Sequence, residues 1–183
     1  IVTDRSRRYS TAWAYDIVDD GKGRYWISSY MGGVFVVDKH KLLSAPTPAI
    51  IADRHYLKEL QGIHVSQLVA DGRGYVWVRM YNSGLDRINL RTMKVEHIVG
   101  KDNKINNICA DRKGNLWVAM QGEVRCFGAN GKTQSYNIEG YNDNAMLCEV
   151  EGYIWVLMGQ DCCILNPDGS STCFSISGFR PLA

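Results

Sequence analysis

The 183-residue sequence contains no apolar run long enough to cross a bilayer as a helix. Its opening residues, from Ile1 onward, show none of the charged, apolar and small-residue segments of a signal peptide. Neither sign of charge dominates, since 21 Lys and Arg face 19 Asp and Glu. We therefore expect no nucleic-acid partner and no direct membrane contact. Because Ile1 opens in mid-pattern, we expect the chain to be part of a larger protein.

Metal-ligand pairs at short spacing are also missing. The six cysteines, at positions 109, 126, 148, 162, 163 and 173, contain no CxxC pair, and the four histidines are scattered singly at positions 40, 55, 64 and 97. A protein metal site usually draws on such pairs. We expect no metal and no cofactor, and we interpret the cysteines as mainly buried free thiols.

What the sequence does contain is a repeated frame, acid-x-x-Gly-x-apolar-Trp-apolar. It occurs at Asp20–Ile27, Asp71–Val78, Asp111–Val118 and Glu149–Val156. The four tryptophans are 51, 40 and 38 residues apart, and a period of about forty is typical of four-stranded propeller blades. We call the residues before each Trp the signature turn and expect an all-β fold.

Each signature turn should close a hairpin. The acid can accept backbone hydrogen bonds, and the glycines at 23, 74, 114 and 152 can take a positive φ. The strand that follows is apolar on nearly every residue, which predicts burial on both faces between neighbouring blades. We therefore assign the acids to turn structure and the four signature tryptophans to the core.

A third strand and a more polar fourth strand complete each repeat. The predicted fragment has about four blades within residues 1–183, at roughly 12–60, 61–99, 100–138 and 139–177. The first repeat is longer because of an insertion at Leu42–His64, in which Asp53–Leu60 could form a short helix. Helix should be nearly absent elsewhere.

The pattern resembles the two-component regulator propeller repeat, most fully at Asp71–Thr92, where the signature turn is followed by Gly-Leu-Asp-Arg-Ile-Asn-Leu-Arg-Thr. The third and fourth repeats depart from it by a shorter stretch after Trp. The resemblance implies part of a seven-bladed propeller from the periplasmic sensor half of a hybrid histidine kinase, with a soluble oligosaccharide as ligand. The repeat motif is scaffold and carries over no ligand residues.

A ligand site is expected on the top face, at the ends of the strands opposite the signature turns. Aromatic platforms mixed with amides and acids suit sugar rings and their hydroxyls. Asn, Asp and Ser are also common in turns for backbone reasons, so each candidate competes with a structural role. The predicted ligand-binding residues are Trp13, Asp16, Tyr30, Tyr81, Asn82, Asn106, Gln121, Asn142 and Asp143; Tyr15, Met31 and Asn107 lie at equivalent positions.

Two other function classes stay open. An enzyme, such as a propeller lyase or hydrolase, would need catalytic groups at the same mouth, but the sequence shows no convergent His and carboxylate pair, and no catalytic residue is predicted. A protein-interaction scaffold would expose apolar residues on the top loops, with which Tyr30, Met31 and Tyr81 are compatible. A non-enzymatic sensor remains the preferred hypothesis.

The incomplete propeller ring leads us to expect that copies of the chain associate. Four blades cannot close as six to eight can, so we expect the first and last blades each to present a wide apolar face. Two copies could pair these faces, and we predict a homodimer or larger assembly of the isolated fragment.

Overall fold

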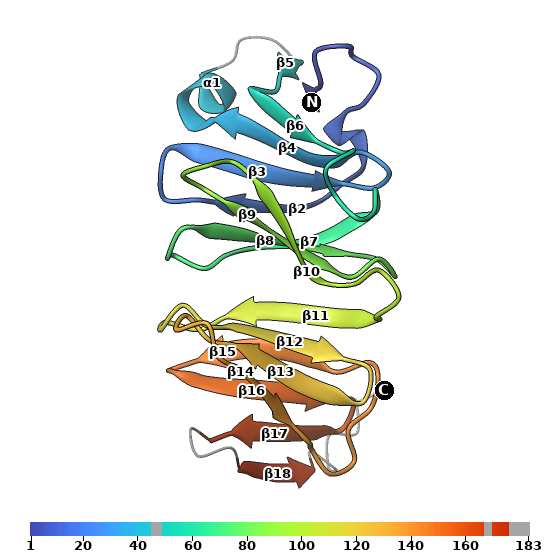
Figure 1. Ribbon diagram of the computed structural model, residues 1–183, viewed down its shortest axis with the longest axis vertical. Helices are drawn as coiled ribbons and strands as arrows, with labels where there is room; N and C mark the ends of the chain where they lie inside the picture. Colours follow the sequence, from blue (N-terminus) through green and yellow to red (C-terminus); the bar gives the residue numbers. More distant parts are fainter. Residues whose placement is uncertain (45–48, 167–169, 176–183) are drawn as a thin grey trace, which may run out of the picture. The chain divides into compact units, whose positions relative to one another are not determined.

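The computed structural model describes residues 1–44, 49–166 and 170–175. The chain divides into two compact units, Ile1–Ile105 (unit 1) and Asn106–Ala183 (unit 2). Each unit is built around two four-stranded sheets, shown in Figure 1. The all-β, blade-like fold predicted from the sequence is confirmed.

In each sheet of unit 1, the strands lie side by side in the order in which they follow along the chain. The first consists of β2 (Ala14–Asp19), β3 (Arg24–Ser29), β4 (Gly33–Asp38) and β6 (Arg54–Tyr56); the second of β7 (Val65–Ala70), β8 (Tyr75–Met80), β9 (Leu85–Asn89) and β10 (Val95–Val99). Neighbouring strands pair antiparallel.

Unit 2 repeats this arrangement. Its first sheet consists of β11 (Ile105–Ala110), whose first residue closes unit 1, with β12 (Leu116–Met120), β13 (Glu123–Phe127) and β14 (Thr133–Tyr136). The second consists of β15 (Met146–Val150), β16 (Tyr153–Met158), β17 (Asp161–Leu165) and β18 (Ser171–Ser175). The exact blade boundaries stay a prediction.

The signature turns form as predicted. The glycines at positions 23, 74, 114 and 152 all have positive φ. One oxygen of Asp20, Asp71 and Asp111 accepts two backbone N–H groups across the turn. The structure adds a bond that sequence reasoning missed, because the other oxygen of each aspartate accepts the indole Nε1–H of the Trp six residues later, at 3.0–3.1 Å.

Three of the four signature tryptophans are buried, with exposed fractions of 0% for Trp26, 4% for Trp77 and 8% for Trp117. Trp26 and Trp117 belong to the cores between the two sheets of their units. The prediction was wrong for Trp155, which is only partly buried. Trp155 lies in the last sheet, and no further sheet among the described residues of unit 2 covers it. Its turn acid, Glu149, bonds instead to the N–H of Gly152.

The insertion of the first repeat contains strands and not the expected helix over Asp53–Leu60. Arg54–Tyr56 pairs with Val34–Val36 as the fourth strand of the first sheet, and the ring of Tyr56 is fully buried beside Trp26. Burial of Tyr56 therefore outweighs local helix propensity. Short helices lie elsewhere: α1 (Lys39–Leu43), with Asp38 as its N-cap, and the 3₁₀ turn η1 (Thr11–Trp13).

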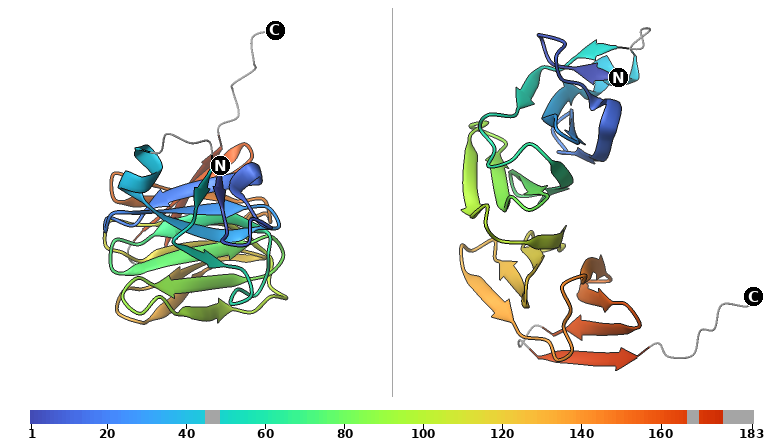
Figure 2. Two further views of the ribbon diagram at one scale, coloured as in Figure 1. Left: turned by 90° about the horizontal axis from the view of Figure 1, so that it is seen from above. Right: turned by 90° about the vertical axis from the view of Figure 1, so that its right-hand side faces the viewer.

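The outer face of the first sheet is covered, contrary to the sequence-based expectation. The parallel pair β1 (Val2–Thr3) and β5 (Ile50–Ile51) lies beside it in Figures 1 and 2. Val2, Ile50 and Ala52 pack there against Ile27, Phe35 and Val37, which are at most 6% exposed. The N-terminal residues and the insertion together supply this cover.

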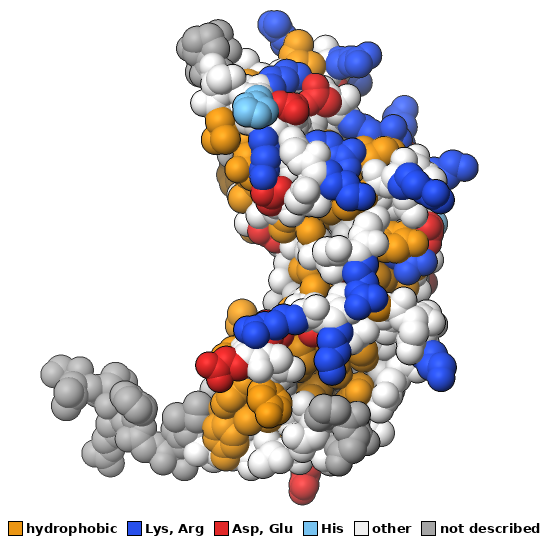
Figure 3. All heavy atoms as spheres, turned by 90° about the vertical axis from the view of Figure 1, so that its left-hand side faces the viewer, with side chains coloured by type: hydrophobic (Ala, Val, Ile, Leu, Met, Phe, Trp, Pro, Cys, Tyr) orange, Lys and Arg blue, Asp and Glu red, His pale blue; other side chains and the backbone are white. Residues whose placement is uncertain are grey.

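The last sheet does present an open apolar face, as predicted. Met146, Tyr153, Leu157 and Phe174 are between 39% and 58% exposed, and Figure 3 shows hydrophobic side chains at the surface of unit 2. Strand β16 accordingly alternates between exposed and buried residues, whereas every residue of β12 is buried.

The expectation of free thiols was wrong for one pair, since Cys163 and Cys173 form a disulfide. They lie directly opposite each other on β17 and β18, with Cα atoms 4.0 Å apart. Strand pairing across ten residues of chain, which cysteine spacing alone did not reveal, brings them together. Cys109, Cys126, Cys148 and Cys162 are free thiols, and burial raises the pKa of Cys109 and Cys126 to about 12.

Candidate functional site

Aromatic side chains gather at the ends of the strands of unit 1, on the edge opposite the signature turns. We call this group, which consists of Trp13, Tyr15, Tyr30, His64 and Tyr81, the aromatic ledge. The exposed fractions of its Trp and Tyr residues run from 44% for Tyr30 to 72% for Trp13. Three of the predicted ligand-binding residues, Trp13, Tyr30 and Tyr81, therefore belong to one surface.

Backbone bonds and ring contacts hold the ledge together. Tyr30 donates its N–H to the carbonyl of Trp13 at 2.9 Å, and Tyr81 donates its N–H to the carbonyl of His64 at 2.8 Å. The ring of Tyr30 lies 4.5 Å from that of His64 and 6.0 Å from that of Tyr15, centroid to centroid. The four segments that carry these residues are thus fixed relative to one another.

His64 adds a polar group that is not used inside the fold. Its Nδ1 atom is buried and has no hydrogen-bond partner among the described residues. A buried polar atom without a partner costs free energy, which a hydrogen bond to a ligand or a water molecule would recover. In the sequence, His64 stood out only as one of four histidines scattered singly.

Two other predicted residues of this region have roles in the scaffold. Both carboxylate oxygens of Asp16 accept backbone N–H groups, from Ile17 and, across to the next sheet, from Leu68, each at 2.8 Å. Asn82 lies in the β8–β9 turn with a φ of 52°, which Asn tolerates better than most residues. Met31, at the same place in the β3–β4 turn, has a φ of 57° and is exposed.

The bond made by Asp16 recurs in unit 2. Asn107 also stands ten residues before its signature Trp, and its Oδ1 accepts the N–H of Leu147 on the neighbouring sheet at 2.8 Å. An acceptor at this position therefore clips adjacent sheets together in both units. The repeat spacing was visible in the sequence, but its partner on the next sheet was not.

The predicted residues of unit 2 form a second, more polar group. Asp143 accepts the N–H of Gly122 at 3.2 Å, which brings it beside the turn that carries exposed Gln121. Asn142 is also exposed, and its Oδ1 accepts the N–H of Asn144. This group contains amides and an acid but no exposed aromatic platform among these residues.

Asn106 lies beside this group and resembles His64 in one respect. Its Nδ2 atom is buried without a partner among the described residues. Tyr141 donates its hydroxyl to the carbonyl of Met120 at 2.7 Å. Burial, with a smaller contribution from Asp143, raises the pKa of Tyr141 to about 12, so this hydroxyl stays a proton donor at neutral pH.

One His and carboxylate pair escaped sequence reasoning. His97 on β10 approaches Asp86 on β9, with Nδ1 and Oδ1 2.7 Å apart. The carboxylate of Asp86 is fully buried and also accepts the backbone and side-chain N–H groups of Gln61. Because Asp86 bonds to both His97 and Gln61, it connects the segment before β7 to strands β9 and β10.

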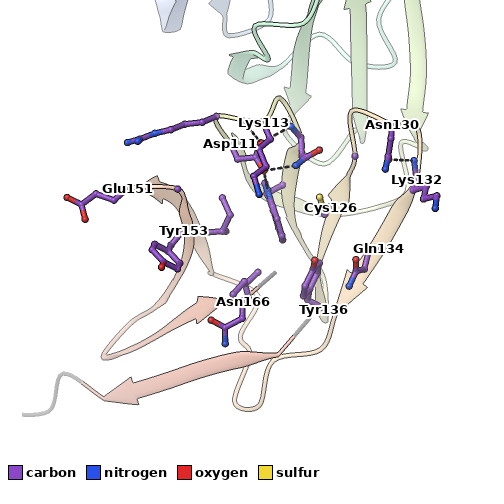
Figure 4. A pocket seen from close by; sticks show the side chains of 17 residues that line it. Asp111, Lys113, Cys126, Asn130, Lys132, Gln134, Tyr136, Glu151, Tyr153 and Asn166 are labelled. Carbon is purple, nitrogen blue, oxygen red and sulfur yellow. Dashed lines mark hydrogen bonds between the residues drawn. The ribbon is translucent and has the colours of Figure 1, made fainter. Parts of the chain in front are cut away.

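A hollow of unit 2 lies on the opposite edge, beside the signature turns. It is a cavity of about 550 Å³ between the two sheets, shown in Figure 4. Its walls include Trp117, Tyr136, Tyr153 and Ile154, with Asn115 and Asn166 among the polar groups. The sequence analysis placed every candidate on the other edge and missed this cavity.

Two features were sought among the described residues: clusters of metal-ligating side chains and helices that could span a membrane. No group of three or more His, Cys, Asp or Glu side chains there is arranged to hold a metal ion. Neither of the short helical segments described is long and apolar enough to cross a membrane.

Comparison with known proteins tests the resemblance. Residues 100–122 match the family model described as two component regulator propeller. The chain carries the two-component regulator propeller repeat. The match covers the first part of the third repeat, whereas the sequence placed the fullest resemblance at Asp71–Thr92. No curated protein sequence gives a significant match.

Solved structures of extracellular domains are similar over nearly the whole chain. One is the extracellular domain of a protein described as the hybrid two component system BT4673 from B. thetaiotaomicron, with 31% identity and a TM-score of 0.86. The alignment covers 98% of this chain but 26% of that domain. The present chain thus spans about a quarter of the length of this relative.

More distant structures share the fold alone. The extracellular domain of BT3049 from B. thetaiotaomicron has 17% identity and a TM-score of 0.62 over 88% of this chain and 22% of that one. A virginiamycin B lyase from Staphylococcus aureus has 13% identity and a TM-score of 0.68 over 90% of this chain and 56% of that one. At such identities the lyase carries no information about activity here.

Proposed function

We propose that this chain is part of the extracytoplasmic, periplasmic sensor domain of a hybrid two-component system, and that it binds a soluble oligosaccharide without transforming it. The observation that carries the proposal is the aromatic ledge of unit 1. Its rings are exposed, joined through their backbones, and accompanied by the unpaired Nδ1 of His64.

The chemistry of the ledge suits a sugar. The faces of Trp13, Tyr15 and Tyr81 offer apolar platforms for the C–H faces of pyranose rings, while tyrosine hydroxyls and imidazole nitrogen can bond to hydroxyl groups. Neighbours that are extracellular domains of two-component systems support the placement outside the cytoplasm. The Cys163–Cys173 disulfide is in keeping with an oxidising compartment.

A sensor fits the ledge better than an enzyme does. Catalysis of bond cleavage would need an acid and a base that converge on the ligand. The ledge carries one imidazole, that of His64, and the nearby carboxylate of Asp16 is occupied by two backbone N–H groups. In the His97 and Asp86 pair, the carboxylate of Asp86 already accepts two hydrogen bonds from Gln61.

Calorimetric titration of the chain with a panel of neutral and acidic oligosaccharides tests the proposal. We expect binding by at least one of them, a loss of at least tenfold in affinity for Trp13→Ala and Tyr81→Ala, and an unchanged ligand on chromatographic analysis afterwards. Tyr153→Ala is the matched control, because Tyr153 is similarly exposed but lies in unit 2; its affinity should stay within twofold.

Three outcomes would contradict the proposal. A cleaved or eliminated product would favour the lyase or hydrolase alternative. Equal losses for Tyr153→Ala and Trp13→Ala would remove the ledge from the site. Failure of every glycan to bind, together with capture of a protein partner that depends on Trp13 and Tyr81, would favour an interaction scaffold.

A further inference from the structure

Guanidinium groups cover aromatic faces along the signature-turn edge of unit 1. Arg24 lies over Trp26 with 5.9 Å from Cζ to the ring centroid, and Arg54 lies over Tyr56 at 4.6 Å. Arg87 lies over both Tyr75 and Trp77, at 4.4 and 5.4 Å. A cation over an aromatic face is attracted by the ring quadrupole, so this edge of the repeat is suited to guanidinium groups.

Arg24 shows how such a group is held between two sheets. Its Nε donates to Oδ2 of Asp20 at 2.6 Å, the same oxygen that accepts the indole N–H of Trp26. Its terminal nitrogens reach the carbonyl of Leu90 at 3.5 Å and the sulfur of Met93 at 3.3 Å, both in the turn that joins β9 and β10 of the second sheet. The guanidinium thus bridges the two sheets of unit 1.

Unit 2 keeps this frame but lacks the cation. Asn115 stands two residues before Trp117, as Arg24 stands two before Trp26. Its Nδ2 donates to Oδ2 of Asp111 at 2.7 Å, which replaces the bond made by Arg24 Nε, and its Oδ1 accepts the N–H of Ala129. The shorter side chain satisfies the aspartate but does not extend between the sheets.

The cavity of about 550 Å³ occupies this place in unit 2. The indole of Trp117 and the ring of Tyr136, 5.1 Å apart, correspond to Trp26 and Tyr56 of unit 1. Over the described residues, no Arg or Lys side chain lies on either face of this pair. Its volume falls in the range of small-molecule sites.

We propose that this cavity binds a guanidinium group, supplied by an arginine side chain of a peptide or by a small guanidinium compound. The group would lie against Trp117 and Tyr136, with Ile154 and Asn166 on the facing wall. Figure 4 shows Tyr136, Tyr153 and Asn166 around the hollow, with Glu151 and Lys132 at its two ends. This site is independent of the ledge and does not rest on the sensor function.

The basic residues at the rim do not oppose this assignment. Arg112 is paired with Glu149 at 3.1 Å. Lys113 occupies the position that Lys22 has in unit 1, where Arg24 is nevertheless bound. Glu151 adds a carboxylate to the same walls and Lys132 an ammonium group at the other end, while the carboxylate of Asp111 is already hydrogen-bonded to Asn115 and Trp117. A planar, weakly hydrated guanidinium is also better suited to stacking than a lysine ammonium.

The indole N–H resonance of Trp117 in ¹⁵N-labelled protein reports on the site. We expect millimolar N-acetyl-arginine amide to shift it with saturation, and the uncharged isostere N-acetyl-citrulline amide to leave it unchanged. A Gly-Arg-Gly peptide separates the two sources: at least tenfold tighter binding of the peptide indicates a peptide arginine, whereas equal affinity indicates a small compound. Equal shifts from arginine and citrulline amides would overturn the proposal.

Asn115→Arg provides an internal competitor, since its side chain should fill the cavity as Arg24 does in unit 1. We expect it to weaken arginine amide binding at least tenfold, with far-UV circular dichroism confirming the fold. Asn144→Arg is the matched control, because it adds the same charge to unit 2 on an exposed residue that does not line the cavity. Undiminished binding by folded Asn115→Arg would contradict the assignment, as would an equal loss in the control.

Discussion

The two units share one frame but differ where their sheets meet beside the signature turns. In unit 1 the contact is filled, because Arg24 reaches from Asp20 to Leu90 and Met93 in the β9–β10 turn of the next sheet. In unit 2 Asn115 stops at Asp111, and a cavity of about 550 Å³ remains. The two units therefore differ at one position, two residues before the signature Trp. Arg24 stands there in unit 1, where the contact is closed, and Asn115 in unit 2, where it is open.

The ends of the units differ as well. The outer face of the first sheet is covered by β1 and β5, whereas the last sheet exposes Met146, Tyr153 and Leu157. The repeat fixes the four strands and the Asp–Trp bond of a sheet. What covers each face depends on residues outside the repeat.

The largest effect should come from the signature tryptophans. Trp26→Ala and Trp117→Ala each remove a ring from the core between two sheets, which should lower the free energy of unfolding by about 3–5 kcal/mol. Trp77→Ala should cost a similar amount because Trp77 is 4% exposed. Trp155→Ala should cost less than half as much, because that ring is already partly in solvent. Urea melts of the four variants give the ranking, and a loss under about 1 kcal/mol for Trp77→Ala would show that its strand is misassigned.

Exchanging the residues at the differing position sharpens the comparison directly. Arg24→Asn should lower the free energy of unfolding by about 2 kcal/mol, since it breaks charged hydrogen bonds to Asp20. Asn115→Arg should raise it by about 1 kcal/mol by filling the cavity. Urea melts of both variants and of Asn144→Arg, the charge control, measure this. The two changes in the free energy of unfolding need not be equal in size. If both variants were stabilised, or both destabilised, the residue at this position would not explain the difference between the units.

The signature aspartates predict a pH dependence. Burial alone would raise the pKa of Asp111, but hydrogen bonds from Trp117, Asn115 and Lys113 together hold it below its ordinary value. The stabilisation is therefore present above the unfolded pKa of about 3.9 and is lost as the pH falls through the lower folded pKa. Asp111→Asn should be less stable than the parent by about 1–2 kcal/mol at pH 6.

This difference should shrink as the pH approaches 2, because a protonated aspartate resembles asparagine. Urea melts between pH 2 and pH 7 follow the difference. Exposed Asp102→Asn serves as the control and should track the parent throughout. A difference for Asp111→Asn that stays constant down to pH 2 would show that its carboxylate does not titrate with folding.

The smallest effect concerns association through the open face of unit 2. We expect the isolated chain to form a homodimer or larger assembly at micromolar concentration, driven by burial of Met146, Tyr153, Leu157 and Phe174. Leu157→Asp should shift the population toward monomer, and Lys104→Asp, an exposed change in unit 1, should not. Light scattering decides, and a monodisperse species near 20.6 kDa for the unmodified chain would contradict the prediction.

The sequence by itself determined the repeated architecture. The turn glycines and the apolar second strands act within about ten residues of chain, and the tryptophans repeat this pattern about every forty residues. Local pattern was therefore sufficient to predict four hairpin-based sheets. The grouping of Trp13, Tyr30 and Tyr81 also followed, because strand order alone places those turns on one edge. A strand signal in Arg54–Tyr56 was too short to compete with a helical interpretation.

Only the tertiary structure decided the contacts between sheets and at their ends. The clip from Asp16 to Leu68 joins residues 52 positions apart, and the bridge from Arg24 to Met93 joins residues 69 apart. No periodicity marks such partners, because they depend on how neighbouring repeats pack. For the same reason the Cys163–Cys173 disulfide, the cover over the first sheet and the cavity beside Trp117 became visible only when strands distant in sequence were placed side by side.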